Sequence, residues 1–276
     1  MYGEEIRYVE QHWPYSCVVT IAQGALLFVV ASVAGALNSV AGGGSFLTFP
    51  ALIFAGVPPV IANATNSVAV WPGGVAGAFA YRTELHEMRR ELVALSASSF
   101  LGGLLGALLL LRTTDAAFMG LVPWLLLAAT SLFSFGGIVT QRIRSLSTGP
   151  ASPRAQMVSL VAVQFVIGIY GGYFGGGMGI MMLASLAVMG MTRIHAMNAL
   201  KTVLTTVING IAIVAFIAAG KIAWGYALLM AIGATGGGYM GAFAARMSDP
   251  KWMRRFILLV AWAMTAWFFV KQYGAR

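Results

Sequence analysis

The fold is decided by the stretch Gly35-Ala-Leu-Asn-Ser-Val-Ala-Gly-Gly-Gly-Ser45, which returns in altered form as Gly168-Ile-Tyr-Gly-Gly-Tyr-Phe-Gly-Gly-Gly-Met178. The two triple glycines, at 42–44 and 175–177, are 133 residues apart. In each copy, a long apolar run precedes the glycines and a short apolar run follows them. Self-similarity at a fixed spacing indicates one structural unit that is used twice.

Further matches at a shift of 133 or 134 residues support this repeat. Gly102-Gly103 falls on Gly236-Gly237, and Arg112-Thr-Thr-Asp115 falls on Arg246-Met-Ser-Asp249. Glycine pairs can coincide by chance in an apolar chain, but a charged pair at the same offset is harder to dismiss. We predict a first repeat with a short N-terminal tail at 1–140, a cytoplasmic linker at 141–156 and a second repeat at 157–276.

The composition is that of an all-α polytopic membrane protein. Apolar residues make up 59% of the chain and charged residues 9%, against about 25% charged residues in an average soluble domain. The ranges 21–81, 92–111 and 116–140 contain no charged residue, and a membrane span needs about 20 apolar residues. We therefore read the net charge of +9 as basic cytoplasmic loops and expect no nucleic-acid partner.

Each repeat is predicted to contain about five helical segments, of which the second is short. A segment of 12–14 residues reaches only about 20 Å, less than the ~30 Å hydrocarbon core. These short segments follow the triple glycines, so we expect broken or re-entrant half-helices there. The ten predicted segments are 17–41, 45–56, 62–81, 92–111 and 117–140, then 157–174, 177–190, 196–219, 223–245 and 251–271.

The number of crossings per repeat is odd whether the short segment crosses or re-enters, so the two repeats are predicted to have inverted topology. The arginine-rich and lysine-rich loops 82–91, 141–156 and 246–255 then share one side, which the positive-inside rule assigns to the cytoplasm. Both termini are expected outside. Inverted repeats with glycine-interrupted segments at matching positions are typical of secondary transporters, whose substrate site lies where the broken helices meet.

The distribution of acidic residues favours an anionic substrate. All 8 acidic residues fall in predicted loops or in the N-terminal tail, whereas a buried cation usually needs a buried carboxylate. The N-terminus of a half-helix offers backbone N–H groups and a positive dipole end to an anion. The glycine turns and the serine after the first turn are therefore candidate site residues: Gly42, Gly43, Gly44, Ser45, Gly175, Gly176 and Gly177. Simple close packing of helices is the alternative role for glycine.

The third segment of each repeat adds polar side chains. Lys201 is the one basic residue placed well inside an apolar segment. It either contributes to the site or extends to the nearby interface. Asn66, at nearly the equivalent position, either binds substrate or makes a helix–helix hydrogen bond. The remaining candidates are Asn38 before the first turn, Thr65 in the first repeat, and Asn198, Thr202 and Thr205 in the second.

Two motifs resemble the sulfite exporter TauE/SafE family. The first is Gly35 to Ser45 with Phe49-Pro50 and Ala62-Asn-Ala-Thr-Asn66, and the second is Gly171 to Gly179 with His195-Ala-Met-Asn-Ala-Leu-Lys-Thr202. The resemblance covers essentially the whole chain. It implies a permease in the bacterial inner membrane for small sulfur-containing anions such as sulfite or organic sulfonates. This chain has Asn198-Ala-Leu200 before the lysine, where other second repeats tend to read Gly-Thr-Ser.

Three other functions remain as alternatives to a sulfur-anion permease. The chain could carry another small anion or a metal ion, act as a membrane enzyme, or assist assembly of another membrane complex. No catalytic dyad, thiolate cluster or nucleotide motif supports an enzyme, and we expect no cofactor. The expected partners are a small anionic substrate and the lipid bilayer, with a homo-oligomer left open.

Overall fold

The computed structural model describes residues 21–40, 43–81, 85–86, 88–146, 153–188, 191, 193–245 and 250–274. Within these ranges every element of regular secondary structure is an α-helix. The first repeat contains α2 (Ile21–Val40), α3 (Ser45–Phe54), α4 (Pro59–Ala80), α6 (Arg89–Leu111) and α7 (Asp115–Leu146). The second contains α8 (Pro153–Tyr173), α9 (Met178–Val188), α10 (Ile194–Ala218), α11 (Trp224–Ala245) and α12 (Pro250–Tyr273). The predicted order of long and short helices is confirmed.

The two short helices, α3 and α9, have 10 and 11 residues. Gly43 precedes α3 with φ 104°, and Gly56 follows it with φ 83°. Residues with a side chain rarely adopt such angles, so the helix cannot extend through either position. Pro59 then begins α4 at the first helical position, where its missing N–H breaks no helical hydrogen bond.

Five helices are long and apolar enough to cross a membrane: α2, α6, α7, α8 and α10. Three others, α4, α11 and α12, have 22, 22 and 24 residues, which is also a membrane-spanning length at 1.5 Å per residue. Large apolar side chains such as Phe79, Trp124 and Leu259 lie exposed on the outside of the bundle. The chain is an all-α, polytopic membrane protein.

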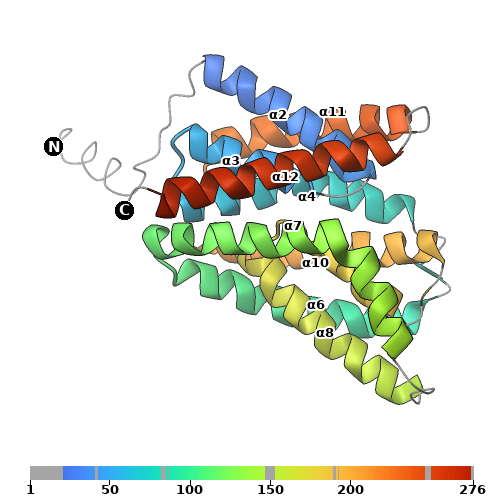
Figure 1. The fold of residues 1–276 in the computed structure, drawn as a ribbon. Helices are drawn as coiled ribbons and strands as arrows, with labels where there is room; N and C mark the ends of the chain where they lie inside the picture. Colours follow the sequence, from blue (N-terminus) through green and yellow to red (C-terminus); the bar gives the residue numbers. More distant parts are fainter. Residues whose placement is uncertain are drawn as a thin grey trace.

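The helices of the two sequence halves interleave rather than forming two separate bodies. Figure 1 shows α2 packed along α11 in one part of the bundle, and α6 packed along α8 in the other. The central helices α4 and α10 pack on each other, and each also contacts the long fourth helix of the opposite half: α4 contacts α11, and α10 contacts α6. Exchanging the halves maps the α2–α11 contact onto the α6–α8 contact and the α4–α11 contact onto the α10–α6 contact, and it leaves the α4–α10 contact unchanged. This is the packing that two repeats related by a two-fold axis would produce.

The starts of equivalent helices give the spacing between the two halves more exactly than the matches in the sequence do. The first residues of α3 and α9 are 133 residues apart, whereas those of α4 and α10, of α6 and α11, and of α7 and α12 are each 135 apart. The change of two residues falls between α9 and α10. With this spacing, Lys201 on α10 is the counterpart of Asn66 on α4, and Asn198 is the counterpart of Asn63.

Glycine contacts show the same register. A Cβ on Gly102 would lie 2.5 Å from the carbonyl oxygen of Phe165, and a Cβ on Gly237 would collide with the carbonyl oxygen of Ser32. Ser32 and Phe165 are 133 residues apart, so Gly102 corresponds to Gly237 and not, as the sequence comparison has it, to Gly236. These glycines let the backbones of α6 and α8, and of α2 and α11, approach closely.

The helix ends that flank the three basic loops lie at one end of the bundle, on the right in Figure 1. They are the end of α4 and the start of α6, the end of α7 and the start of α8, and the end of α11 and the start of α12. The beginning of α2 and the end of α12 lie at the opposite end. Parts of the loops, including 82–84, 147–152 and 246–249, fall outside the described residues. The arrangement agrees with one cytoplasmic face for all three loops.

Candidate functional site

The first glycine turn is held by Asn38. The backbone N–H of Gly44 donates a hydrogen bond of 2.8 Å to Asn38 Oδ1, and a Cβ on Gly44 would lie 2.5 Å from the carbonyl oxygen of Ala34. The N–H groups of Phe46 and Leu47 donate to the carbonyls of Gly43 and Gly44, at 3.0 and 2.9 Å. Most donors at the start of α3 are therefore already occupied. Gly42, the first residue of the predicted cradle, lies outside the described residues.

The second glycine turn keeps its donors free. Gly175 and Gly177 have φ of 77° and 76°. In the described part of the chain, no acceptor takes a hydrogen bond from the N–H groups of Gly176, Gly177 or Gly179, while Met178 N–H makes only a long bond of 3.4 Å to Gly175. Unpaired N–H groups at a helix start carry partial positive charge. This turn therefore fits the predicted anion cradle better than the first.

Tyr170 fixes the position of the second turn. Its hydroxyl, one turn before the end of α8, donates a hydrogen bond of 2.6 Å to the carbonyl oxygen of Gly176. With this carbonyl engaged, the peptide unit after Gly176 is oriented, and so is the N–H of Gly177. Tyr170 is not among the site residues predicted from the sequence, because a tyrosine within an apolar helix carries no signal of its partner.

Lys201 lies beside the start of α9. A Cβ on Gly179 would lie 3.3 Å from Cδ of Lys201 and 3.5 Å from its Cγ, so the lysine stem runs along the glycine. The side chain is partly exposed. The structure thus brings together Lys201 and the free N–H of Gly179, two positively charged or polarised donors from different helices. An anion that contacts both would be held by charge and by hydrogen bonds.

The second glycine turn packs against α3, the helix that follows the first turn. A Cβ on Gly177 would lie 3.4 Å from the ring of Phe46, in the first turn of α3. The rings of Phe49 and Phe174 pack edge to face with centroids 5.7 Å apart. The second turn and the first half-helix therefore form one continuous packed region, as expected where two broken helices meet. Ser45, at the start of α3, is partly buried in this region.

The polar residues of α4 have partners within the protein. Asn66 accepts a hydrogen bond through Oδ1 from the hydroxyl of Thr48 on α3, which matches the helix–helix alternative and keeps Asn66 one turn from the start of α3. Thr65 is fully buried, and its Oγ1 accepts a bond of 3.0 Å from the N–H of Ala223, just before α11. Thr65 thus connects α4 to the residue before α11, and its role in binding stays a prediction.

The threonine hydroxyls of α10 are bonded to its own backbone, and Thr202 also contacts α4. Thr202 Oγ1 donates to the carbonyl of Asn198 at 2.8 Å, and Thr205 Oγ1 donates to the carbonyl of Thr202 at 3.0 Å. Both hydroxyl hydrogens are used within the helix, so only the oxygens remain as acceptors. A Cβ on Gly77 of α4 would lie 3.0 Å from the methyl group of Thr202. These threonines and Asn198 are partly buried, and their role in binding remains a prediction.

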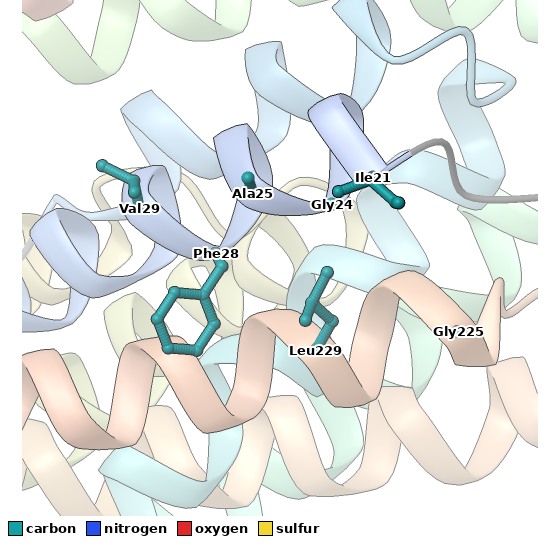
Figure 2. Close-up of a pocket in the computed structure, with 7 residues that line it drawn as sticks. All are labelled: Ile21, Gly24, Ala25, Phe28, Val29, Gly225 and Leu229. Carbon is teal, nitrogen blue, oxygen red and sulfur yellow. The ribbon is translucent and has the colours of Figure 1, made fainter.

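An apolar groove on the outside of the bundle is separate from the glycine turns. It runs between the first halves of α2 and α11 and is lined by Ile21, Gly24, Ala25, Phe28, Val29, Gly225 and Leu229 (Figure 2). Its side chains carry no charge and no hydrogen-bonding group. Such a surface suits lipid acyl chains and offers nothing to a small anion. In the described residues, no group of three His, Cys, Asp or Glu side chains could hold a metal ion.

Comparison with known proteins identifies the family. The model of the sulfite exporter TauE/SafE family matches residues 27–268. The chain belongs to the sulfite exporter TauE/SafE family. This range includes both glycine turns and Lys201, so the TauE/SafE resemblance of the two motifs is confirmed.

Curated relatives are described as transporters. A "Probable membrane transporter protein" of Haemophilus influenzae is 28% identical over 88% of this chain and 92% of its own length. "Probable membrane transporter protein ORF9" of a Sinorhizobium species is 29% identical over 87% and 90%. "Probable membrane transporter protein YfcA" of Escherichia coli K12 is 28% identical over 90% of both chains. No solved structure matches the chain.

Proposed function

We propose that this TauE/SafE protein is a permease that moves a small sulfur-containing anion, such as sulfite or an organic sulfonate, across the bacterial inner membrane. The observation that carries the proposal is the second glycine turn, where the N–H groups of Gly176, Gly177 and Gly179 have no partner in the described structure and Gly179 lies beside the stem of Lys201. A tetrahedral or pyramidal oxyanion has several oxygens to accept from such donors.

The arrangement favours a small anion over a large ligand. Gly177 and Gly179 leave no side chain between the backbone and a ligand, while Phe46, Ala129 and Lys201 occupy the neighbouring space. In the membrane interior, hydrogen bonds to a charged acceptor are strengthened by the low dielectric. We infer that the substrate is recognised mainly through its oxygens, with the organic part of a sulfonate directed away from the turn.

The test is ligand-dependent stabilisation of the purified protein. The unfolding midpoint is measured with sulfite, thiosulfate, sulfoacetate, taurine and sulfate, with acetate and chloride as controls for other anions. A ligand that binds only the folded state raises the midpoint. We expect at least one sulfur anion to do so and to be transported by the protein in lipid vesicles. Stabilisation by acetate alone would assign the site to carboxylates, and no response to any anion would overturn the proposal.

A further inference from the structure

Asn63 carries a buried acceptor that nothing in the described structure satisfies. The residue is 2% exposed, and its Oδ1 has no hydrogen-bond partner. The other end of the same amide donates a bond of 3.0 Å from Nδ2 to the carbonyl oxygen of Tyr173. This bond fixes the orientation, since turning the amide over would bring Oδ1 against that carbonyl. A buried acceptor without a partner is costly and calls for an explanation such as a bound ion.

The partner of Asn63, Tyr173, is the last residue of α8. The N–H groups of Phe174 and Gly175 both donate to the carbonyl of Tyr170. No backbone N–H in the described residues donates to the carbonyls of Gly171 and Gly172 in this last turn. Carbonyls at a helix C-terminus carry partial negative charge. Asn63 therefore lies next to a group of acceptors, and its own free atom is also an acceptor.

Acceptors without donors are complementary to a cation. We propose that Asn63 Oδ1 and the carbonyl end of α8 form a binding site for a monovalent cation, of which Na⁺ is the probe. Neutral amide and carbonyl oxygens replace the hydration shell of a monovalent ion. A divalent ion usually requires carboxylate ligands. Among the residues that the structure describes, no group of three His, Cys, Asp or Glu side chains could hold a metal ion. The ends of broken helices serve as cation sites in other transporter folds.

This site adjoins the proposed anion cradle. The turn at 174–177 joins the carbonyl end of α8 to the N–H end of α9 within a few residues. A cation at the first end and an anion at the second attract each other, so each ion favours the binding of the other. This second step rests on the proposed function, whereas binding of the cation alone does not.

The first experiment needs no sulfur compound. The unfolding midpoint of the full-length protein is measured in chloride salts of sodium, lithium, potassium and choline at equal ionic strength. We expect an alkali cation, sodium foremost, to raise the midpoint relative to choline, and Asn63→Leu to remove the rise. Ser67→Ala, on the same face of α4 with its hydroxyl bonded to the backbone of Asn63, is the matched control and should keep it. Equal midpoints in all four salts would overturn the proposal, as would a rise that persists in Asn63→Leu.

A second variant covers the case in which Asn63→Leu does not fold. Asn63→Asp keeps the acceptor, adds a negative charge and replaces the donor to the Tyr173 carbonyl by a second oxygen, so the stability of this variant should depend on a cation more strongly than that of the wild type. Loss of the dependence in Asn63→Asp would contradict the site. For the coupling step, the affinity of the best sulfur anion is compared in sodium and in choline, with about a tenfold difference expected. If no sulfur anion binds in either salt, the proposed function fails while the cation result stands by itself.

Discussion

The side chain of Asn38 and the backbone of Gly44 are joined by a hydrogen bond of 2.8 Å that ties the end of α2 to the start of α3. Asn38 thus supports the turn, and its Oδ1 is occupied. We expect Asn38→Ala to leave the buried N–H of Gly44 unpaired, at a cost of about 1–3 kcal/mol. The unfolding midpoint should fall, and anion affinity should change little. Ser32→Ala, on the same helix, loses only a hydrogen bond within that helix, so its unfolding midpoint should fall less.

The left-handed glycines allow strain to be separated from binding. Gly177 has φ 76°, and its Cβ would lie 2.9 Å from that of Ala129, whereas Gly56 has φ 83° with open space around it. Alanine at either position should add backbone strain of about 1–2 kcal/mol. Only Gly177→Ala should also weaken anion binding strongly, because the collision of its Cβ with Ala129 would displace the turn that carries the free N–H groups. Binding titrations of the two variants decide this: equal loss in both would assign the effect to strain.

Two neighbouring glycines on α11 also differ in the space that is open to a Cβ. A Cβ on Gly237 would collide with the backbone of Ser32, while a Cβ on Gly236 meets nothing within 4 Å. Gly236→Ala should stabilise α11 by up to about 1 kcal/mol, the helix-propensity difference. Gly237→Ala should separate α2 from α11 and destabilise the protein by about 1–3 kcal/mol. Unfolding midpoints of the two variants test the register, and the opposite order would contradict it.

The order and length of the helices could be predicted from the sequence, because charge-free runs and glycine or proline at their ends are local signals. The same holds for the short helices α3 and α9, whose boundaries are set by Gly43, Gly56 and Gly177. The two-residue change in repeat spacing was missed, because parts of the α9–α10 connection match nothing in the first repeat. Only the helix starts and the Gly102 and Gly237 contacts reveal it.

The candidate site could be predicted only in outline. Glycine-rich turns and an intramembrane lysine are visible in the sequence, and the structure does bring Lys201 to the second turn. Which donors remain free is a property of tertiary contacts. Asn38 accepts the hydrogen bond of the Gly44 N–H, and Thr65 accepts that of the Ala223 N–H, 158 residues away. Nothing in the sequence distinguishes Asn63, with its unpaired oxygen, from Asn66, which accepts a bond from Thr48.

Membrane topology can be tested with single cysteines in a Cys17→Ser background. His86 and Arg142 lie at the end of the bundle assigned to the cytoplasm, and Lys221 and Tyr273 are exposed in the loop before α11 and at the end of α12. We expect cysteines at 86 and 142 to react with an impermeant reagent only in inverted vesicles, and those at 221 and 273 in intact cells. Positions 86 and 221 both fall between the third and fourth segments of their repeats, so labelling of 86 and 221 from the same side would rule out the inverted arrangement of five plus five segments.

Lys201 offers the sharpest test of the anion site. Its stem lies 3.3 Å from the position of a Cβ on Gly179, so Lys201→Met should keep the packing of the stem while it removes the charge. A hydrogen bond to a charged group contributes about 1.5–3 kcal/mol, which corresponds to a ten- to hundredfold loss of anion affinity. Lys201→Arg should retain part of the affinity, limited by its planar, bulkier head group.

The matched control is Lys221→Met, which removes one positive charge from an exposed position and so separates a local contact from the general attraction of a basic protein for anions. Calorimetric titration of the wild type and the three variants with the best sulfur anion gives the comparison. We expect a large loss in Lys201→Met, a partial loss in Lys201→Arg and almost none in Lys221→Met. Equal dissociation constants for the wild type and Lys201→Met would mean that the ammonium group reaches the interface instead, and that the N–H groups of Gly176, Gly177 and Gly179 hold the anion without it.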